Sequence, residues 1–504
     1  MSRHQLKLTK DEKPIHFLFE NSLFLILGTV IALVWANASD MSLRTYQYFF
    51  HEFQLREMIF GEPEFVEGLH YESGLGGYPS LHDEHADSEP ADSESHEPTG
   101  AAGDDAENDL QAEGATNGHA TDAENSAETP ESEEEPDGAK KKRRMTIFKY
   151  PLTWHFIVND ILMMFFFAIA AKEVWESLLP GGALSRPSMA AMPLLATFGG
   201  IAGPAFVYVA GAYLFGGNNF GELSRGWAIP CATDIAFSYL VARLIFGASH
   251  PVIAFLLLLA IADDAAGLAI IAIFYPTDDV VEWSWLLMSV GGMVLAWMMR
   301  RFRVHSFWWY LLIPGTMSWL GFYWAHVHPA LGLVPIIPMM PHALTDLGTF
   351  AIEELDRDDT LSEFEHWWKN PVELILGLFG LANAGVAFST VNVATWLILA
   401  GLLIGKPLGI TLLTFVGDKF LGLSLPNGIQ YRHVFTLSII ASIGFTVALF
   451  VSTAAYEPTS PWLGSMKMGA VLSFVGAILA YVVARVMKIQ PMQQKPAVAE
   501  EGTT

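Results

Sequence analysis

Apolar runs of about twenty residues recur along most of this 504-residue chain, with short polar breaks between them. A helix of that length crosses the ~30 Å hydrocarbon core of a bilayer. We therefore expect an all-α polytopic membrane protein with about 12 transmembrane helices. The predicted segments lie near residues 17–38, 153–171, 189–216, 227–246, 251–275, 283–299, 307–325, 329–341, 371–390, 393–416, 433–454 and 463–486.

One of these runs, "GWAIPCATDIAFSYLVARLIF", contains Pro230 three residues before Thr233 and four before Asp234. Proline removes a backbone donor, so the helix is expected to break there and to expose its N–H and C=O ends. Asp234 would balance a positive half-helix end, and Thr233 would offer an oxygen to a cation. The alternative is that both side chains satisfy only the local backbone.

A second run, "LSIIASIGFTVALF", carries Ser442, Gly444 and Thr446 near its middle. It lies midway through residues 393–486, as the first broken run lies midway through residues 189–275. Interrupted helices at corresponding places of two halves indicate a transporter with inverted-topology repeats. Its site would lie where the two discontinuous helices cross.

Two adjacent carboxylates, Asp263 and Asp264, lie at the middle of "FLLLLAIADDAAGLAIIAIFY". A charged side chain at the bilayer centre costs about 2.5–3.5 kcal/mol, so a purely structural role is disfavoured. Neighbouring residues on a helix point about 100° apart, so one carboxylate can face a partner helix while the other faces a water-filled cavity. The helix geometry does not decide which of the two aspartates faces the partner helix and which faces the cavity. Such a pair can hold protons or a small hard cation in competition, since hard cations favour oxygen ligands.

Lys406 lies near the middle of "WLILAGLLIGKPLGITLLTF". A lysine at that depth is too far from the interface to snorkel. We expect it to be the counter-charge for one of the two aspartates, and a buried lysine could also gain and lose a proton.

The formal net charge of −25 is concentrated in residues 79–139, which hold 20 acidic residues and no Lys or Arg. Segments so poor in apolar residues cannot offset their ordering entropy. We expect residues 51–150 to form an acidic, largely disordered periplasmic insert between the N-terminus with its first helix (1–50) and a transmembrane core (151–487). A solvated linker is one interpretation of the insert, and attraction of cations is the other. Residues 488–504 would form a C-terminal tail.

Lys and Arg residues in short flanks set the orientation of membrane helices. With an even helix count, three basic groups fall on one side, which places both termini in the cytoplasm. These groups are Arg3, Lys7, Lys10 and Lys13; Arg300, Arg301 and Arg303; and Arg485 and Lys488. The basic run at residues 140–144 falls on the other side and argues against this arrangement of the first loop.

Two other functional classes are disfavoured by the sequence. The single Gly-Lys pair, Gly405-Lys406, is followed by Pro407, so the chain has no phosphate-binding loop for an ATP-driven pump. An intramembrane aspartyl protease needs two carboxylates facing each other from separate helices, which adjacent residues cannot provide. We expect a transporter rather than an enzyme, with no cofactor and no nucleic-acid partner.

The segments "VNDILMMFFF", "GWAIPCATDIAF", "LAIADDAAGLAIIAIFY", "ANAGV", "GLLIGKPLGI" and "IGFTVALF" occur in this order along the chain. Together they resemble the NhaA-type Na+/H+ antiporter family, and the resemblance covers nearly everything except the insert and the two tails. The rule about paired broken helices was drawn partly from that family, so it is not independent support here.

The resemblance implies that Asp264 is the principal ion-binding carboxylate and that Asp263 pairs with Lys406 when the ion is absent. It places Thr233 and Asp234 at the crossing of the broken helices. It also implies a further carboxylate in the second helix and a pH-responsive group near the cytoplasmic side. The further carboxylate is Asp160. The pH-responsive group consists of Glu173, His328, Glu365 and His366.

The chain departs from the family in two places. It reads "KEVWES" where the family has two basic residues in place of Trp175 and Glu176, so the family's pH response is not carried over. The acidic insert replaces a hairpin region that contributes to the family's dimer, which leaves a homodimer open.

The implied function is secondary antiport across a bacterial inner membrane, in which Na+ or Li+ leaves the cell in exchange for protons. The exchange would be electrogenic and would serve Na+ and pH homeostasis. The expected partners are Na+, Li+, H+ and membrane lipid. The alternative is a Na+-coupled symporter of an organic solute on a similar fold, which would accumulate that solute with Na+.

Overall fold

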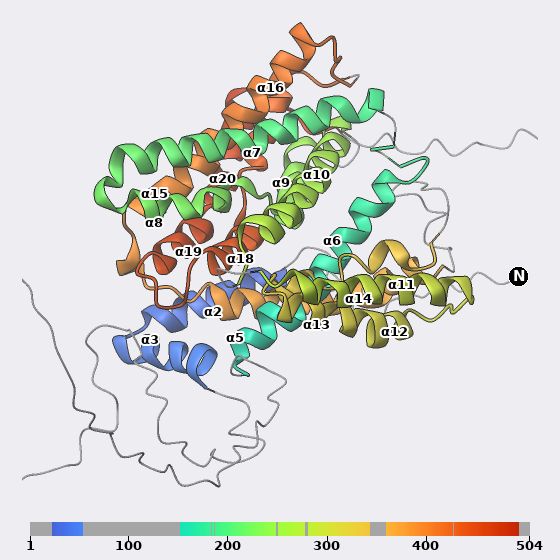
Figure 1. The fold of residues 1–504 in the computed structure, drawn as a ribbon. Helices are drawn as coiled ribbons and strands as arrows, with labels where there is room; N and C mark the ends of the chain where they lie inside the picture. Colours follow the sequence, from blue (N-terminus) through green and yellow to red (C-terminus); the bar gives the residue numbers. More distant parts are fainter. Residues whose placement is uncertain are drawn as a thin grey trace, which may run out of the picture. The chain divides into compact units, whose positions relative to one another are not determined.

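The computed structural model describes residues 23–53, 152–182, 184–185, 187–247, 250–277, 281–342, 359–426 and 428–492. These residues belong to one compact unit. Within these ranges every regular element is a helix (Figure 1). The predicted acidic insert lies outside the described residues except for its first three, and most of the predicted C-terminal tail also lies outside them.

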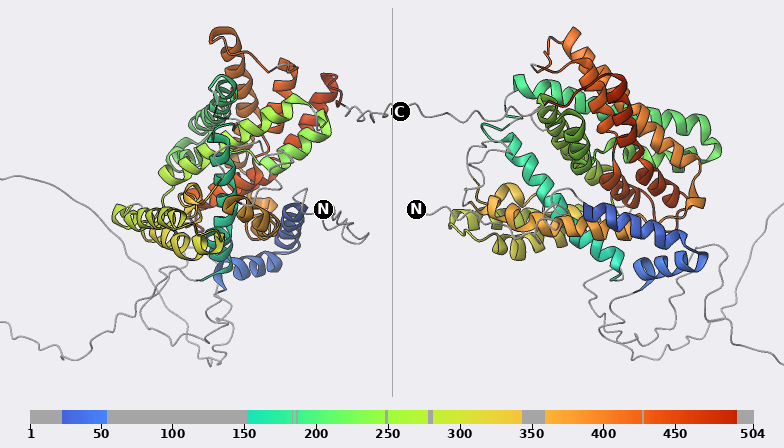
Figure 2. Two further views of the ribbon diagram at one scale, coloured as in Figure 1. Left: turned by 90° about the vertical axis from the view of Figure 1, so that its right-hand side faces the viewer. Right: turned by 180° about the vertical axis from the view of Figure 1, so that it is seen from behind.

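The helix α6 (Met163–Leu178) runs between two groups of helices, contacting α14 on one side and α10 on the other (Figures 1 and 2). The first group contains α2 (Leu23–Asn37), α3 (Asp40–Gln47), α5 (Trp154–Phe156), α11 (Trp283–Arg301), α12 (Phe307–Tyr310), α13 (Thr316–Trp324) and α14 (Thr360–Asn383). The second contains α7 (Pro187–Phe215), α8 (Phe220–Ser224), α9 (Ile235–Phe246), α10 (Pro251–Phe274), α15 (Val393–Ala400), α16 (Lys406–Phe420), α17 (Tyr431–Ile440), α18 (Phe445–Ala455), α19 (Leu463–Leu472) and α20 (Val475–Val486).

Five of the described helical spans are long and apolar enough to cross a membrane, and two bent helix pairs raise the number to seven. The five are Trp154–Leu178, Ala190–Phe215, Pro251–Phe274, Val393–Phe420 and Leu463–Val486. This pattern fits a polytopic membrane protein, although it does not reach the predicted count of about twelve. The prediction of a membrane helix over residues 329–341 is wrong. That stretch consists of turns and two short 3-10 helices, Pro329–Leu331 and Ile337–Met339, because prolines interrupt its helical hydrogen bonding.

The helix α10 shows how the sequence sets the start of a span. His250 is its N-cap and accepts a hydrogen bond from the backbone N–H of Val252 at 3.1 Å. Pro251 follows at the first helical position, where its missing N–H costs nothing and its fixed φ favours the helix. The helix then runs without interruption through the aspartate pair to Phe274.

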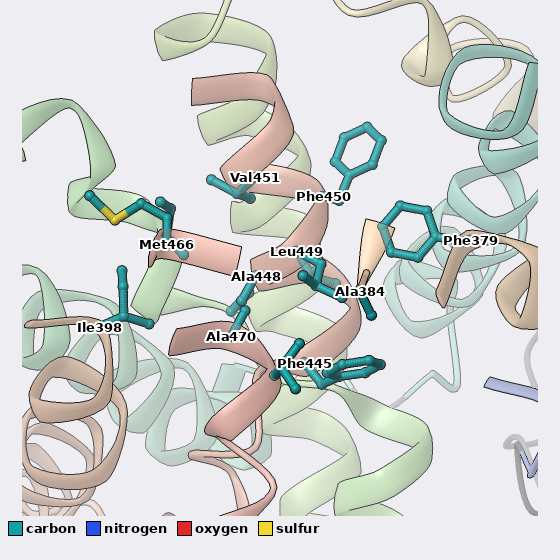
Figure 3. Packing of buried hydrophobic residues seen from close by; sticks show 14 of the residues in the cluster. Phe379, Ala384, Ile398, Phe445, Ala448, Leu449, Phe450, Val451, Met466 and Ala470 are labelled. Carbon is teal, nitrogen blue, oxygen red and sulfur yellow. The ribbon is translucent and has the colours of Figure 1, made fainter. Parts of the chain in front are cut away.

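The helix α18 is enclosed on all sides although it is only half of a bent pair. Phe445, Ala448, Leu449 and Phe450 are each 0 % exposed. Figure 3 shows these side chains packed against residues of α14, α15 and α19. Because interiors pack as closely as organic crystals, this packing holds α18 in a defined position at the crossing described below.

Glycines allow α7 to lie directly against the segment that carries Lys406. A Cβ atom on Gly199 would meet the backbone carbonyl of Gly409, and one on Gly203 would meet the carbonyl of Gly405. Small residues at such spacing let two helix backbones approach closely in a membrane. Figures 1 and 2 show α7 and α16 side by side, which sets the position of Lys406.

Candidate ion-binding site

Two bent helix pairs cross at the centre of the candidate site. In the first pair, residues 217–231 end before α9, and in the second α17 ends before α18; each pair is bent by 50°. The breaks touch each other, since the backbone N–H of Asp234 donates to the carbonyl of Ile443 at 2.8 Å. The four half-helix ends therefore point into one small region, where their partial charges meet.

Asp234 caps the N-termini of two half-helices at once. Its Oδ1 accepts from the backbone N–H of Phe237 at 3.2 Å, and its Oδ2 accepts from the backbone N–H of Thr446 at 3.2 Å. The Thr446 hydroxyl also donates to Oδ2. A carboxylate at a helix N-terminus satisfies orphan donors and balances the positive end of the helix dipole. The structure thus places Asp234 where the chain breaks, as the sequence predicts.

Thr233 and Ser238 satisfy the opposite end of the crossing. The Thr233 hydroxyl donates to the carbonyl of Ala441 at 3.2 Å, and the Ser238 hydroxyl donates to the carbonyl of Ile440 at 3.1 Å. These carbonyls lie at the C-terminal end of α17, where helical carbonyls lose their intrahelical partners; the Ile440 carbonyl also accepts from the backbone N–H of Ile443 at 3.1 Å. Thr233 is 1 % exposed, and its oxygen retains lone pairs that could contact a cation.

Lys406 lies between Asp263 and a half-helix end. Its Nζ donates to Asp263 Oδ2 at 3.0 Å, with the two side chains 0 % and 3 % exposed. The same ammonium donates to the backbone carbonyl of Cys231, the last residue of the 3-10 helix Arg225–Cys231. Lys406 therefore neutralises both a carboxylate and the negative end of a helix dipole. Cys231 is the chain's single cysteine.

Two of the candidate residues lie at π-helical segments inside long spans. Asp160 lies within the π-helix Ile157–Leu162, and Lys406 directly follows the π-helix Gly401–Gly405. Such segments insert an extra residue into the helix and occur often at functional sites. Sequence reasoning did not foresee these irregularities, which depend on packing rather than on a local motif.

Asp264 faces a small cavity rather than a partner. It is partly buried, and none of the described residues donates a hydrogen bond to it. The cavity has a volume of about 10 Å³, close to the least that one water needs. Its lining consists of Phe166, Phe167, Ala170, Ala232, Asp263, Asp264, Gly267, Leu268, Ile271 and Val447. A second cavity of about 10 Å³ borders Asp263, Cys231 and Gly267.

Asp160 and His328 lie together, apart from the aspartate pair. His328 Nδ1 is 3.7 Å from Asp160 Oδ1, so the two form an ion pair when the imidazole is protonated. The His328 ring packs on Phe450 of α18, with 4.6 Å between ring centroids. The structure therefore links this pair to the crossing through packing rather than through hydrogen bonds.

Glu173 and Glu365 lie around a lysine that sequence reasoning did not select. Lys172 is 5 % exposed and pairs with both Glu176 and Glu365, which joins α6 to α14. Glu173 is the next residue along α6, one turn beyond Ala170 in the first cavity. His366 is exposed. The signal for Lys172 was present in the sequence, since it directly follows the apolar run of residues 163–171.

Trp175, one of the departures from the family, contacts His342. Its Nε1–H donates to His342 Nε2 at 3.4 Å, while His342 Nδ1 lies 2.9 Å from the carbonyl of Met340. The Arg300 guanidinium lies 3.4 Å from the same Nδ1. Burial is the main cause that lowers the pKa of His342, so its neutral form fits these contacts.

A further buried lysine, Lys467 on α19, was also missed. It is 4 % exposed and donates to Asn383 Oδ1 at 3.4 Å, while Asn383 donates to Asn159 Oδ1 at 2.8 Å. Burial, followed by the positive charge of Lys467, lowers the pKa of His51 to about 3.

In the described ranges, no group of three or more His, Cys, Asp or Glu side chains could hold a resident metal.

These features define a class of protein: a polytopic membrane transporter with buried carboxylates at a crossing of broken helices. Residues 138–487 match the family described as Na+/H+ antiporter 1. The chain belongs to this Na+/H+ antiporter family, as the resemblance in its sequence predicts.

Curated relatives support the same assignment. The chain is 49 % identical over 360 residues to the Na+/H+ antiporter NhaA of Jannaschia sp. (strain CCS1), covering 68 % of this chain and 85 % of the relative. It is 51 % identical over 346 residues to NhaA of Geotalea uraniireducens (strain Rf4), covering 68 % and 88 %. It is 48 % identical over 343 residues to NhaA of Geobacter sulfurreducens (strain ATCC 51573 / DSM 12127 / PCA), covering 67 % and 88 %. No finding supports the symporter alternative.

Proposed function

We propose that this protein is a secondary antiporter that moves Na+ out of the cell in exchange for protons, and that Asp264 is its principal ion-binding residue. One observation carries the site assignment: Lys406 satisfies Asp263, while Asp264 faces a cavity without a hydrogen-bond donor from the described residues. An unpaired carboxylate in a buried site favours either a proton or a cation over the bare charged form.

In this proposal Asp264 binds the transported ion, and Asp263 alternates between Lys406 and the cation. Protons occupy the site first, and Na+ or Li+ then displaces them because hard cations favour carboxylate oxygens. Asp263 can leave Lys406 to join the cation, since the lysine keeps a second acceptor in the Cys231 carbonyl. Thr233 and Asp234 stabilise the half-helix ends beside the site while it opens to one side and then the other.

The direction of transport follows from charge. Exchanging two protons for one Na+ would carry one net charge inward, worth about 2.3 kcal/mol per 100 mV of membrane potential. The membrane potential could then drive Na+ extrusion. We propose Glu173, His328, Glu365 and His366 for the pH response and Asp160 as a supporting carboxylate.

The remaining features extend the family membership. We propose about twelve membrane segments in inverted repeats, both termini in the cytoplasm, and a bacterial inner-membrane location, with residues 51–150 as a periplasmic insert. Li+ and membrane lipid belong to the same proposal, and a homodimer remains an arrangement to be tested by the mass of the solubilised protein.

Inverted membrane vesicles that report proton movement on addition of Na+ test the proposal directly. Asp264→Asn should abolish the Na+-induced signal without lowering expression. Asp418→Asn is a matched control, because Asp418 is a carboxylate near the end of α16 that contacts Tyr431 and Lys419 instead of the site. Retained exchange in Asp264→Asn would refute the site, and absence of exchange in the unaltered protein would refute the function.

A further inference from the structure

Gly267 lies on the face of α10 that carries the two aspartates. It follows Asp264 by three residues and Asp263 by four, which places all three on neighbouring positions of one helix surface. Gly267 lines both of the cavities beside the aspartate pair. Asp263, Ala232 and Val447 line both cavities as well, and Gly267 is the glycine among these four shared residues.

Packing does not require glycine at position 267. A Cβ atom placed there would have no atom within 4 Å outside its own helix and chain neighbours. By contrast, a Cβ on Gly444 at the crossing would come within 2.8 Å of the carbonyl of Ala232. Glycine weakens a helix interior relative to alanine. If the open space beside position 267 had no role, alanine there would make α10 more stable than glycine does.

The cavity walls offer few ligands to a cation. Apart from Asp263 and Asp264, the side chains that line the first cavity are apolar. Two carboxylates do not fill the coordination sphere of a hard cation, which takes its remaining oxygen ligands from water or backbone carbonyls. A volume of about 10 Å³ accommodates about one water. Because Gly267 borders both cavities, a side chain at position 267 would extend into the open space beside them.

We propose that Gly267 is a specificity-determining residue, whose missing side chain keeps room for one water that completes the coordination of Na+ beside Asp264. This inference rests on the proposed function, because it takes the aspartate pair as the cation site. Li+ is smaller than Na+ and is satisfied by fewer ligands. Filling the space should therefore weaken Na+ exchange more than Li+ exchange.

The test compares Gly267→Ala, Gly267→Ser and Gly221→Ala in inverted vesicles, with Na+ or Li+ added over a range of concentrations. Gly221 is the matched control, because it is an exposed helical glycine on α8 that also has open space at its Cβ position. Gly267→Ala should raise the Na+ concentration for half-maximal exchange about three- to tenfold, the effect of losing one ligand contact. The corresponding concentration for Li+ should rise less.

Gly267→Ser should fall between Gly267→Ala and the unaltered protein, because its hydroxyl can replace the oxygen of the displaced water. Gly221→Ala should leave both cations unchanged. Thermal unfolding of the purified protein in detergent should show Gly267→Ala at least as stable as the unaltered protein, which separates a change at the site from misfolding.

The inference is overturned if Gly267→Ala leaves both cations unchanged, shifts them equally, or matches Gly267→Ser. The proposed function fails in a different way. In that case the unaltered protein shows no exchange, or Asp264→Asn retains it, whatever the Gly267 variants do.

Discussion

Lys406 and Asp263 form an ion pair with 3.0 Å between Nζ and Oδ2, although 143 positions separate them in the sequence. Both side chains are shut off from solvent. A buried pair of this kind recovers its desolvation cost only with good geometry and further hydrogen bonds. The Cys231 carbonyl supplies one such hydrogen bond. The pair gives one carboxylate of the site a fixed partner and leaves the other facing the cavity.

Removing one partner of this pair should be more harmful than removing both. Lys406→Met should lower the free energy of unfolding by about 3–5 kcal/mol, because Asp263 would be left as a buried, uncompensated charge. The double variant Lys406→Met with Asp263→Asn should recover a large part of that loss. Thermal unfolding of the four proteins in detergent forms a double-mutant cycle. Additive effects would show that the two residues are not coupled.

Asp234→Asn should destabilise the protein less than Asp234→Ala. Asp234→Asn keeps an oxygen that can accept from one half-helix end, whereas Asp234→Ala removes the caps of both α9 and α18. Each lost N-cap costs about 0.5–2 kcal/mol, so the alanine variant should be the less stable of the two. Chemical unfolding monitored by tryptophan fluorescence would measure the difference. Equal stability of the two variants would rule out the double-capping role.

The contact between α7 and α16 should be sensitive to side-chain size. Gly203→Leu would force a side chain into the Gly405 carbonyl, and overpacking costs about 1–3 kcal/mol. The shift would also displace Lys406, so Na+-induced proton movement should fall. Gly221→Leu is the control, because nothing lies near that exposed position. Similar behaviour of the two variants would show that close helix approach does not matter here.

His342 should make stability depend on pH. Its pKa in the folded protein is lowered by burial, below the usual unfolded value of about 6.5. The folded state then binds fewer protons than the unfolded state. Its contribution is present above about pH 6.5 and is lost as the pH falls through the folded-state pKa. His342→Gln should therefore show a flatter decline of the unfolding temperature on acidification.

The exposed His305 supplies the control for that experiment. His305→Gln should keep the pH slope of the unaltered protein, since its side chain is open to solvent. If His342→Gln and the unaltered protein decline in parallel, the slope originates elsewhere in the molecule.

The acidic insert should be dispensable if it is only a linker. Deleting residues 86–135 should leave Na+-induced proton movement largely intact, because segments of this composition lack the apolar residues to build a packed core. A variant in which the 20 acidic residues of 79–139 are replaced by Asn and Gln would separate length from charge. Loss of exchange at low Na+ in that variant alone would favour the cation-attracting role.

The sequence alone identified most of the candidate site, because burying a charge in a membrane is costly and such residues are few. Asp263, Asp264 and Lys406 interrupt apolar runs, and Pro230 marks a helix break. These signals are local, so they do not depend on how the helices pack. Lys467 also interrupts an apolar run and Lys172 directly follows one, so the sequence carried a similar signal for both of these buried lysines.

Only the tertiary structure decided which groups meet. The 100° step between Asp263 and Asp264 allowed either to face a partner, and only the family resemblance favoured Asp263. The packed structure brings Lys406 Nζ to 3.0 Å from Asp263 Oδ2, with close glycine contacts holding its segment against α7. The sequence likewise placed Asp234 at a break but could not show that it also caps the helix beginning near Thr446. Contacts between residues this far apart depend on helix rotation and close approach. Those are properties of the packed bundle and are absent from any single segment.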